Sequence, residues 1–247
     1  MIHARGLTKT FGPAEAVRGI DLDVSPGEIV GFLGPNGAGK TTTLRMLTTL
    51  LRPTSGTATV AGADLFADPA AVRRRIGYVA QGGAFAPFSP VGQELVLQAR
   101  LYGLTREQAR ERVTTLLAEL DLPEVEERTT ATMSGGQKRR LDIAMGLLHQ
   151  PELLFLDEPT TGLDPQSRAN LWDHLRRLRE RDGLTVFLTT HYLEEADALC
   201  DRVLIIDHGR IVAEGTPDEL KSEHGARTLD DVFLAVTGRE LREAATA

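Results

Sequence analysis

Hydrophobic and polar positions alternate in the N-terminal part of the chain in the manner of β-strands. Ile20, Leu22 and Val24 are separated by aspartates, which is the period of a strand with one buried face. Ser25–Glu28 contains a Pro-Gly pair and predicts a turn. Ile29–Leu33 is hydrophobic throughout, as expected for a short strand covered on both faces. This part of the chain is therefore expected to consist of strands and tight turns.

A helical pattern follows after a glycine-rich loop. Leu44, Leu47 and Leu51 recur at the spacing of one helical face, and we expect one helix to carry all three. Further along, Thr105 and Gln108 have the spacing of a capping box, which marks the start of a helix. The hydrophobic face behind this box consists of Val113, Leu116, Leu117 and Leu120. The middle of the chain is thus predicted to be helical.

Strands and helices alternate in the last third. Leu153–Leu156 and Val186–Leu188 are hydrophobic runs of strand length, and residues 171–178 between them have a helical period. Val203–Ile206 and Arg210–Val212 predict a hairpin. Alternation of this kind favours an α/β fold with a largely parallel sheet, built as one cassette with an inserted helical block.

Composition narrows the class of protein. The 247 residues include 28 Lys and Arg against 35 Asp and Glu, which gives a formal net charge of −7. A protein that coats nucleic acid usually has a basic surplus instead. The single cysteine, Cys200, leaves no internal disulfide framework. The hydrophobic runs are shorter than the roughly 20 residues of a membrane span, so any action at a membrane is expected to need a partner.

A phosphate-binding loop lies between the strand at Ile29–Leu33 and the following helix. Gly34–Thr41 matches G-x-x-x-x-G-K-[ST] in the context that this motif requires. Backbone amides of such a loop surround phosphate oxygens, Lys40 would meet the β- and γ-phosphates, and the Thr41 hydroxyl would bind Mg²⁺. The loop alone does not choose among kinases, GTPases, motors and transport ATPases.

Polar residues end two later strands at the edge where ligands bind in parallel sheets. Asp157 is suited to the Mg²⁺ shell, and Glu158 to act as general base toward water. His191 follows the next strand and is a candidate for contacting the γ-phosphate or orienting Glu158. The alternative is a charged helix entrance before Pro159, with a histidine that is merely structural. Ser134–Gln137 is equally open to two interpretations, a capping box or a glycine-rich helix start that binds an anion.

These motifs, in this order, resemble the ATP-binding subunit of ATP-binding cassette (ABC) transporters over nearly the whole chain. The matching segments are the P-loop Gly34–Thr41, the glutamine loop ending at Gln81, the signature Met133–Gln137, the acidic strand Leu153–Glu158, the subunit-crossing loop Thr161–Asp164, the switch histidine His191 and the adenine-stacking Phe11. The resemblance implies an α/β P-loop NTPase, an ABC ATPase cassette with a RecA-like core, an N-terminal antiparallel β subdomain and an inserted helical subdomain. The cassette is expected over residues 1–225, its helical subdomain at about 86–150, and a short helical tail over 226–247.

The resemblance also implies the roles of individual residues. Catalysis is assigned to Lys40, Gln81, Glu158 and His191, and Mg²⁺ binding to Thr41, Gln81 and Asp157. ATP contacts are assigned to Phe11, Gly34, Pro35, Asn36, Gly37, Ala38, Gly39, Lys40, Thr41, Thr42, Ser134, Gly135, Gly136, Gln137 and Asp164. Met133 stands where many relatives have leucine, and Phe11 where many have tyrosine; neither exchange changes the expected role.

The implied partners are a second cassette and a membrane protein. Two cassettes would sandwich two ATP molecules head to tail, with Ser134 and Gly136 of one facing the P-loop of the other, and a homodimer satisfies this arrangement. A polytopic transmembrane permease subunit is the second expected partner, at the cytoplasmic face of the cell membrane, where this chain would be peripheral. No nucleic-acid partner is expected. The Gly- and Pro-rich segment 82–90 is either a docking surface for the permease or a plain surface loop.

Three segments resemble the bacterial drug-export ATPases of the daunorubicin-resistance type: Met133–Leu141, Thr189–Leu199 and the tail Leu229–Arg239. They favour export of a drug, an antibiotic or a lipid-like hydrophobic compound and do not identify the substrate. Two alternatives stay open. One is a soluble ABC ATPase acting on nucleic acid or ribosomes, which generally has two cassettes or a coiled-coil insertion. The other is a clamp that binds ATP without turnover, which the intact Lys40, Glu158 and His191 disfavour.

Overall fold

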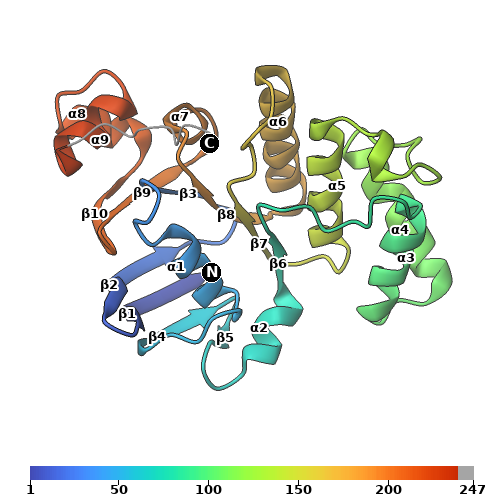
Figure 1. The fold of residues 1–247 in the computed structure, drawn as a ribbon, viewed down its shortest axis with the longest axis horizontal. Coiled ribbons are helices and arrows are strands. Elements are labelled where there is room, and N and C mark those ends of the chain that lie inside the picture. The colour runs from blue at the N-terminus through green and yellow to red at the C-terminus, as the bar shows by residue number, and fades with distance from the viewer. Residues whose placement is uncertain (239–247) are drawn as a thin grey trace.

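Two β-sheets organise the fold in the computed structural model, which describes residues 1–238 (Figure 1). The first sheet is antiparallel, with the order β2 (Ala14–Val24), β1 (Ile2–Phe11), β4 (Ser55–Val60) and β5 (Ala63–Asp64). The second has the order β10 (Arg210–Gly215), β9 (Arg202–Asp207), β3 (Ile29–Leu33), β8 (Thr185–Thr190), β7 (Leu153–Asp157) and β6 (Ile76–Val79). The predicted α/β class and the antiparallel N-terminal strands are confirmed.

The second sheet is parallel from β9 to β6, and only the predicted hairpin β9–β10 adds an antiparallel pair within the described residues. Residues of its central strand β3 face two hydrophobic cores in alternation. Ile29 and Leu33 pack into one core, and Val30 and Phe32 into the other. Burial on both faces explains why this strand is a continuous hydrophobic run.

The first helix, α1 (Lys40–Leu47), is shorter than the sequence pattern predicts. Leu44 and Leu47 are buried on it as expected, but the helix ends before Leu51. Thr49 has a φ of 64°, a left-handed conformation that cannot continue a right-handed helix. Leu51 reaches the core from the loop instead, so its helical spacing was a coincidence.

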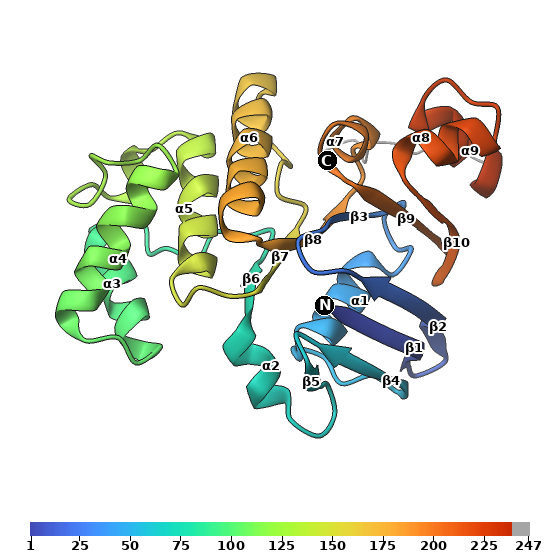
Figure 2. The ribbon, with the colours of Figure 1, turned by 180° about the vertical axis from the view of Figure 1, so that it is seen from behind.

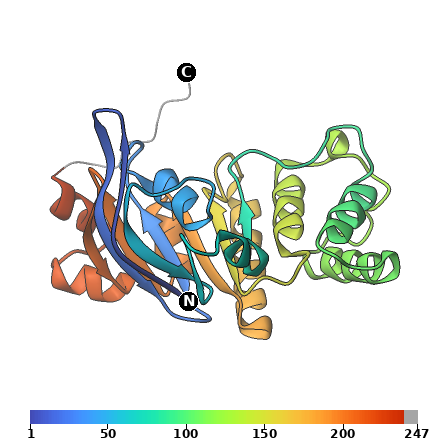
Figure 3. The ribbon, with the colours of Figure 1, turned by 90° about the horizontal axis from the view of Figure 1, so that it is seen from below.

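Helices inserted between β6 and β7 form the far end of the molecule from the antiparallel sheet (Figures 2 and 3). They are α3 (Val91–Leu101), α4 (Arg106–Glu119), a short 3₁₀ turn (Thr130–Thr132) and α5 (Gly135–Leu147). The capping box of Thr105 and Gln108 begins α4 as predicted. The helix α6 (Pro165–Asp182) packs beside α5, and α2 (Pro69–Arg75) precedes β6. The exact limits of a helical subdomain at 86–150 stay a prediction.

The C-terminal part folds back on the cassette through α7 (Leu193–Leu199), α8 (Pro217–Glu223) and α9 (Leu229–Thr237). Leu229, Val232 and Phe233 of α9 are buried in the larger core. The predicted tail continues over residues 239–247, which lie outside the described residues. In residues 1–238, every helix is too short or too polar to cross a lipid bilayer.

Candidate nucleotide-binding and catalytic site

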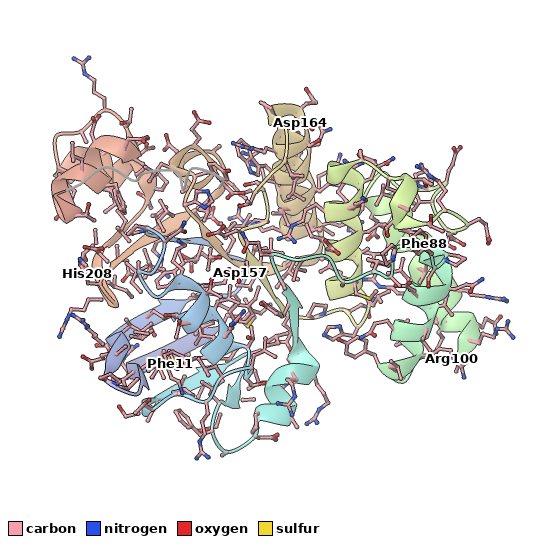
Figure 4. All side chains as sticks on the ribbon, in the orientation of Figure 1. Phe11, Phe88, Arg100, Asp157, Asp164 and His208 are labelled. Carbon is pink, nitrogen blue, oxygen red and sulfur yellow. The ribbon has the colours of Figure 1, made fainter. Side chains whose placement is uncertain are left out.

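Four neighbouring parallel strands deliver the candidate residues to one edge of the second sheet. The P-loop leaves β3, His191 follows β8, Asp157 ends β7 with Glu158 directly after it, and Gln81 lies just beyond β6. Because these strands are parallel and adjacent, their carboxyl ends meet, and Figure 4 shows Asp157 at the centre of the molecule where they do so. The fold therefore explains how residues far apart in sequence share one site.

The P-loop packs closely against neighbouring backbone, and its lysine is buried. A Cβ atom at Gly34 would lie 2.4 Å from the backbone oxygen of Ile206, and Gly39 has a φ of 110°, so both positions need glycine. Lys40 is 5% exposed and donates from Nζ to the carbonyl oxygen of Gly34 at 2.6 Å and of Pro35 at 3.3 Å. Burial lowers the pKa of Lys40, and the nearby carboxylates of Glu158 and Asp157 oppose that shift.

Asp157 lies between two hydroxyl groups. Its Oδ1 accepts a hydrogen bond from Thr189 Oγ1 at 2.6 Å and from Thr41 Oγ1 at 3.3 Å. Carboxylate and hydroxyl oxygens are the hard ligands that Mg²⁺ prefers, and Mg²⁺ commonly takes its other ligands from phosphate and water. No group of three or more His, Cys, Asp or Glu suited to a metal occurs in residues 1–238. The oxygens of Thr41 and Asp157 thus fit a Mg²⁺ ion that takes its other ligands from a nucleotide and water.

Glu158 is the centre of the polar contacts. Its Oε1 lies 3.7 Å from Lys40 Nζ and 3.3 Å from His191 Nδ1. Its Oε2 accepts from Gln81 Nε2 at 3.1 Å and from Thr161 Oγ1 at 3.3 Å. Contact with His191 lowers the pKa of Glu158, helped by Lys40 and Thr161 and opposed by burial. The group is therefore an ionised carboxylate at neutral pH, able to orient water and accept hydrogen bonds.

The signature residues lie at the start of α5, beside the start of α6. Ser134 and Gln137 form the capping box that the sequence allowed. A Cβ at Gly136 would lie 2.7 Å from Ser167 Oγ, and one at Gly135 would lie 3.8 Å from Leu163. Within residues 1–238, no hydrogen bond or ion pair joins this segment to the P-loop of the same chain. The capping box does not exclude anion binding by this segment, because the capping box and an anion site would use the same helix start.

Asp164 and Phe11 also lie apart from the sheet edge. Asp164 caps α6, accepting from the Ser167 amide at 2.9 Å and from its hydroxyl at 2.7 Å. Phe11 ends β1, is 47% exposed, and has Lys9 Nζ 5.1 Å from its ring centre. Figure 4 shows Phe11, Asp157 and Asp164 in three separate regions. The structure thus brings together Lys40, Thr41, Gln81, Asp157, Glu158 and His191, and leaves Phe11, Asp164 and the signature residues outside that cluster.

Arg139 is a further residue at this site that the sequence reasoning missed. It lies on α5 and its guanidinium hydrogen-bonds the backbone on both sides of Glu158. Carbonyl groups of distant segments leave no spacing pattern, so the sequence offered only two opposite charges, Arg139 and Asp142, three residues apart on a helix rich in hydrophobic residues.

The sequence matches the ABC transporter family over residues 17–161. The chain is 50% identical over 228 residues to the daunorubicin/doxorubicin resistance ATP-binding protein DrrA of Streptomyces peucetius, a match that covers 92% of this chain and 69% of the relative. The chain therefore belongs to the ABC transporter family and is an ATP-binding subunit of that family.

Solved structures agree with this assignment. The structure of an ATP-binding subunit of an ABC transporter superimposes with a TM-score of 0.84 at 29% identity, over 96% of this chain and 99% of that one. A dimeric, post-hydrolysis state of the ATP-binding cassette MJ0796 bound to ADP and Pi has a TM-score of 0.78 at 27% identity, over 87% of this chain and 98% of that one. The fold is thus that of an ABC ATPase cassette, as predicted.

Proposed function

We propose that this chain hydrolyses ATP at the edge formed by β3, β8, β7 and β6, with Glu158 as the general base. The supporting observation is the placement of Glu158 between Lys40 and His191, at 3.7 Å and 3.3 Å. A carboxylate held ionised beside a phosphate-binding lysine is suited to accept a proton from an attacking water. His191 would orient the carboxylate and contact the γ-phosphate, and Gln81 would help to position the water.

Thr41 and Asp157 would hold Mg²⁺, with Gln81 as the third residue near it. When bound, Mg²⁺ neutralises charge that develops on the β- and γ-phosphates. Lys40 now donates to P-loop carbonyls, and the same ammonium would turn to the phosphates when ATP binds. Gly34–Thr41 and Thr42 would surround the phosphates, with backbone N–H groups donated by all of these residues except Pro35, and Phe11 would stack on adenine.

A second copy of this chain would complete each site. Ser134–Gln137 lies at a helix start that, within residues 1–238, no hydrogen bond or ion pair links to the P-loop of the same chain, and it lies beside the start of α6, which Asp164 caps. A two-fold dimer would place this surface on the partner's γ-phosphate and so would enclose two ATP molecules. The dimeric state of the MJ0796 cassette supports such an arrangement.

The export function rests on the relative from Streptomyces peucetius, whose name attaches it to daunorubicin and doxorubicin resistance. We propose that the chain works beneath a separate polytopic permease, at the cytoplasmic face of the membrane, and drives export of a drug-like or lipid-like compound. The segment 82–90, with Phe88 84% exposed, is the proposed docking surface for that permease. The formal charge of −7 disfavours the alternative of action on nucleic acid.

The variant Glu158→Gln tests the proposed function. It keeps the volume and one hydrogen-bond acceptor but removes the proton-accepting charge, so we expect ATP to bind while turnover falls by about 10²–10⁴-fold. ATPase rate and equilibrium ATP binding should be measured on the parent and the variant, with and without the co-purified permease or added nucleic acid.

Turnover of the variant near the parental rate would remove Glu158 from the role of base. A parent that binds ATP without turnover would support the nucleotide-gated clamp instead. Stimulation by nucleic acid alone would favour the other alternative, an ABC ATPase that acts on nucleic acid or ribosomes.

A further inference from the structure

Arg139 of the signature helix is bonded to the backbone of both catalytic segments. It is 7% exposed, and its guanidinium donates to three carbonyl oxygens. Nη1 donates to Ala80 at 2.7 Å, Nη2 to Asp157 at 3.1 Å and Nε to Pro159 at 2.8 Å. The last two residues flank Glu158, so the arginine holds the peptide that carries the proposed base.

The same helix holds the glutamine loop on both sides. Ala80, bonded to Arg139, comes immediately before Gln81. Beyond Gln81, the amide of Ala84 donates to Asp142 Oδ1 at 3.0 Å, and Asp142 Oδ2 lies 3.9 Å from Arg139 Nη1. Arg139 and Asp142 therefore form one buried pair, named here the α5 brace, that spans the glutamine loop and the end of β7.

Stability alone gives a weak reason for such a pair. Burial lowers the pKa of Arg139, with Asp142 opposing, so the fold holds a positive charge where desolvation disfavours it. Buried ion pairs seldom stabilise a fold more than hydrophobic residues of equal volume do. What the planar guanidinium supplies is a fixed fork of donors, which can set the relative positions of several carbonyl groups.

We propose that Arg139 is a positioning residue for ATP hydrolysis, which fixes Gln81 and Glu158 relative to the signature helix, and that Asp142 keeps the fork in place. The proposal rests on the proposed role of Glu158 as general base. Because the signature residues begin α5, any displacement of that helix when the second chain engages would be passed to both catalytic segments through the α5 brace.

The substitution Arg139→Lys tests the proposal with Arg140→Lys as its control. Lysine keeps the charge but cannot donate to three carbonyls in fixed directions. Arg140 is the next residue of the same helix, and its Nε has no hydrogen-bond partner among the described residues. We expect Arg139→Lys to lower kcat by about 10²-fold, the effect of a misplacement near 1 Å. The KM and the equilibrium affinity for ATP should change little, and Arg140→Lys should match the parent.

Hydrogen–deuterium exchange without nucleotide gives a readout that does not depend on turnover. Residues 80–84 and 157–160 should exchange faster in Arg139→Lys than in the parent, while Arg140→Lys leaves them unchanged. If the parent itself does not hydrolyse ATP, the proposed function fails, and this exchange comparison still decides whether the α5 brace exists.

Parental kcat or parental exchange in Arg139→Lys would overturn the proposal. So would a loss of ATP affinity equal to the loss of kcat, because that is the mark of general structural damage. Should Arg139→Lys fail to fold, Asp142→Asn decides. Its side-chain oxygen can still accept from Ala84 while the attraction for Arg139 is gone, so kcat should fall with ATP affinity retained, and a parental kcat would overturn the proposal.

Discussion

Glu158 has an unusual backbone conformation for a residue with a side chain. Its φ is 45°, in the left-handed region, which costs a non-glycine residue about 1–3 kcal/mol. The Glu158 amide compensates in part by donating to both the carbonyl and the hydroxyl oxygen of Thr189, each at 3.1 Å. This backbone geometry directs the carboxylate toward Lys40 and His191, so the strained conformation serves to place the proposed base.

The ionisation of Glu158 predicts how stability depends on pH. Contact with His191 lowers the pKa of Glu158 below its ordinary value of 4.5, so the unfolded chain binds the proton more readily than the folded one. The stabilisation is therefore complete well above pH 4.5 and is lost as the pH falls through the lower, folded value. We compare the free energy of unfolding of the parent with that of Glu158→Gln. The difference between the two should be constant near neutral pH, and below pH 4.5 the parent should lose stability relative to the variant.

Urea denaturation of both proteins across this range measures that difference, and His191→Ala serves as a second comparison that should weaken the pH dependence. A difference that instead moves in the parent's favour as the solution becomes more acidic would mean that the folded protein raises the pKa of Glu158.

At the scale of elements, α5 packs unusually close to β6. A Cβ atom at Gly77 would lie 2.3 Å from the backbone oxygen of Gly146, and one at Gly146 would lie 2.9 Å from the Val79 side chain. Paired glycines thus let the helix approach the strand. This approach brings Arg139 within hydrogen-bond distance of Ala80, just past the end of β6.

The variant Gly77→Ala is expected to destabilise the fold by about 1–3 kcal/mol, since the added methyl group meets backbone rather than a flexible side chain. Gly83→Ala is the matched control, because its Cβ would meet Asp142 at an ordinary 3.8 Å. Chemical denaturation of the two variants and the parent measures the effect. Equal stability of Gly77→Ala and the parent would show that α5 can shift without cost.

Local patterns predicted most elements, because strand alternation and capping boxes are properties of neighbouring residues. Ser134 and Thr105 begin helices as their spacing indicates, and the P-loop lies between a strand and a helix. The same reasoning failed at Leu51, where a left-handed residue at Thr49 interrupts the helix. Local patterns also could not identify Arg139, because only the order of the strands brings its carbonyl partners close to it.

At the scale of the whole molecule, the residues proposed to contact ATP lie in two separate places in one chain. The P-loop cluster lies at the sheet edge, whereas Ser134–Gln137 lies at the start of α5 beside α6. A helix start attracts negative charge, and in the proposed dimer that charge is the γ-phosphate held by the other chain. Under this proposal one copy can bind ATP, but it needs a second copy to enclose the nucleotide.

Turnover per chain should consequently rise with protein concentration. In the parent, dilution separates the dimer and should lower the ATPase rate per molecule, because each site loses the signature residues of its neighbour. Ser134→Arg places a bulky cation at the contact between chains, so it should bind ATP with parental affinity and remain slow at every concentration.

Glu158→Gln is the control for assembly, since it should form stable dimers with ATP that size-exclusion chromatography detects. A parental rate per molecule that does not change on dilution through the range where the dimer dissociates would contradict the shared site, and with it the dependence of catalysis on a second chain.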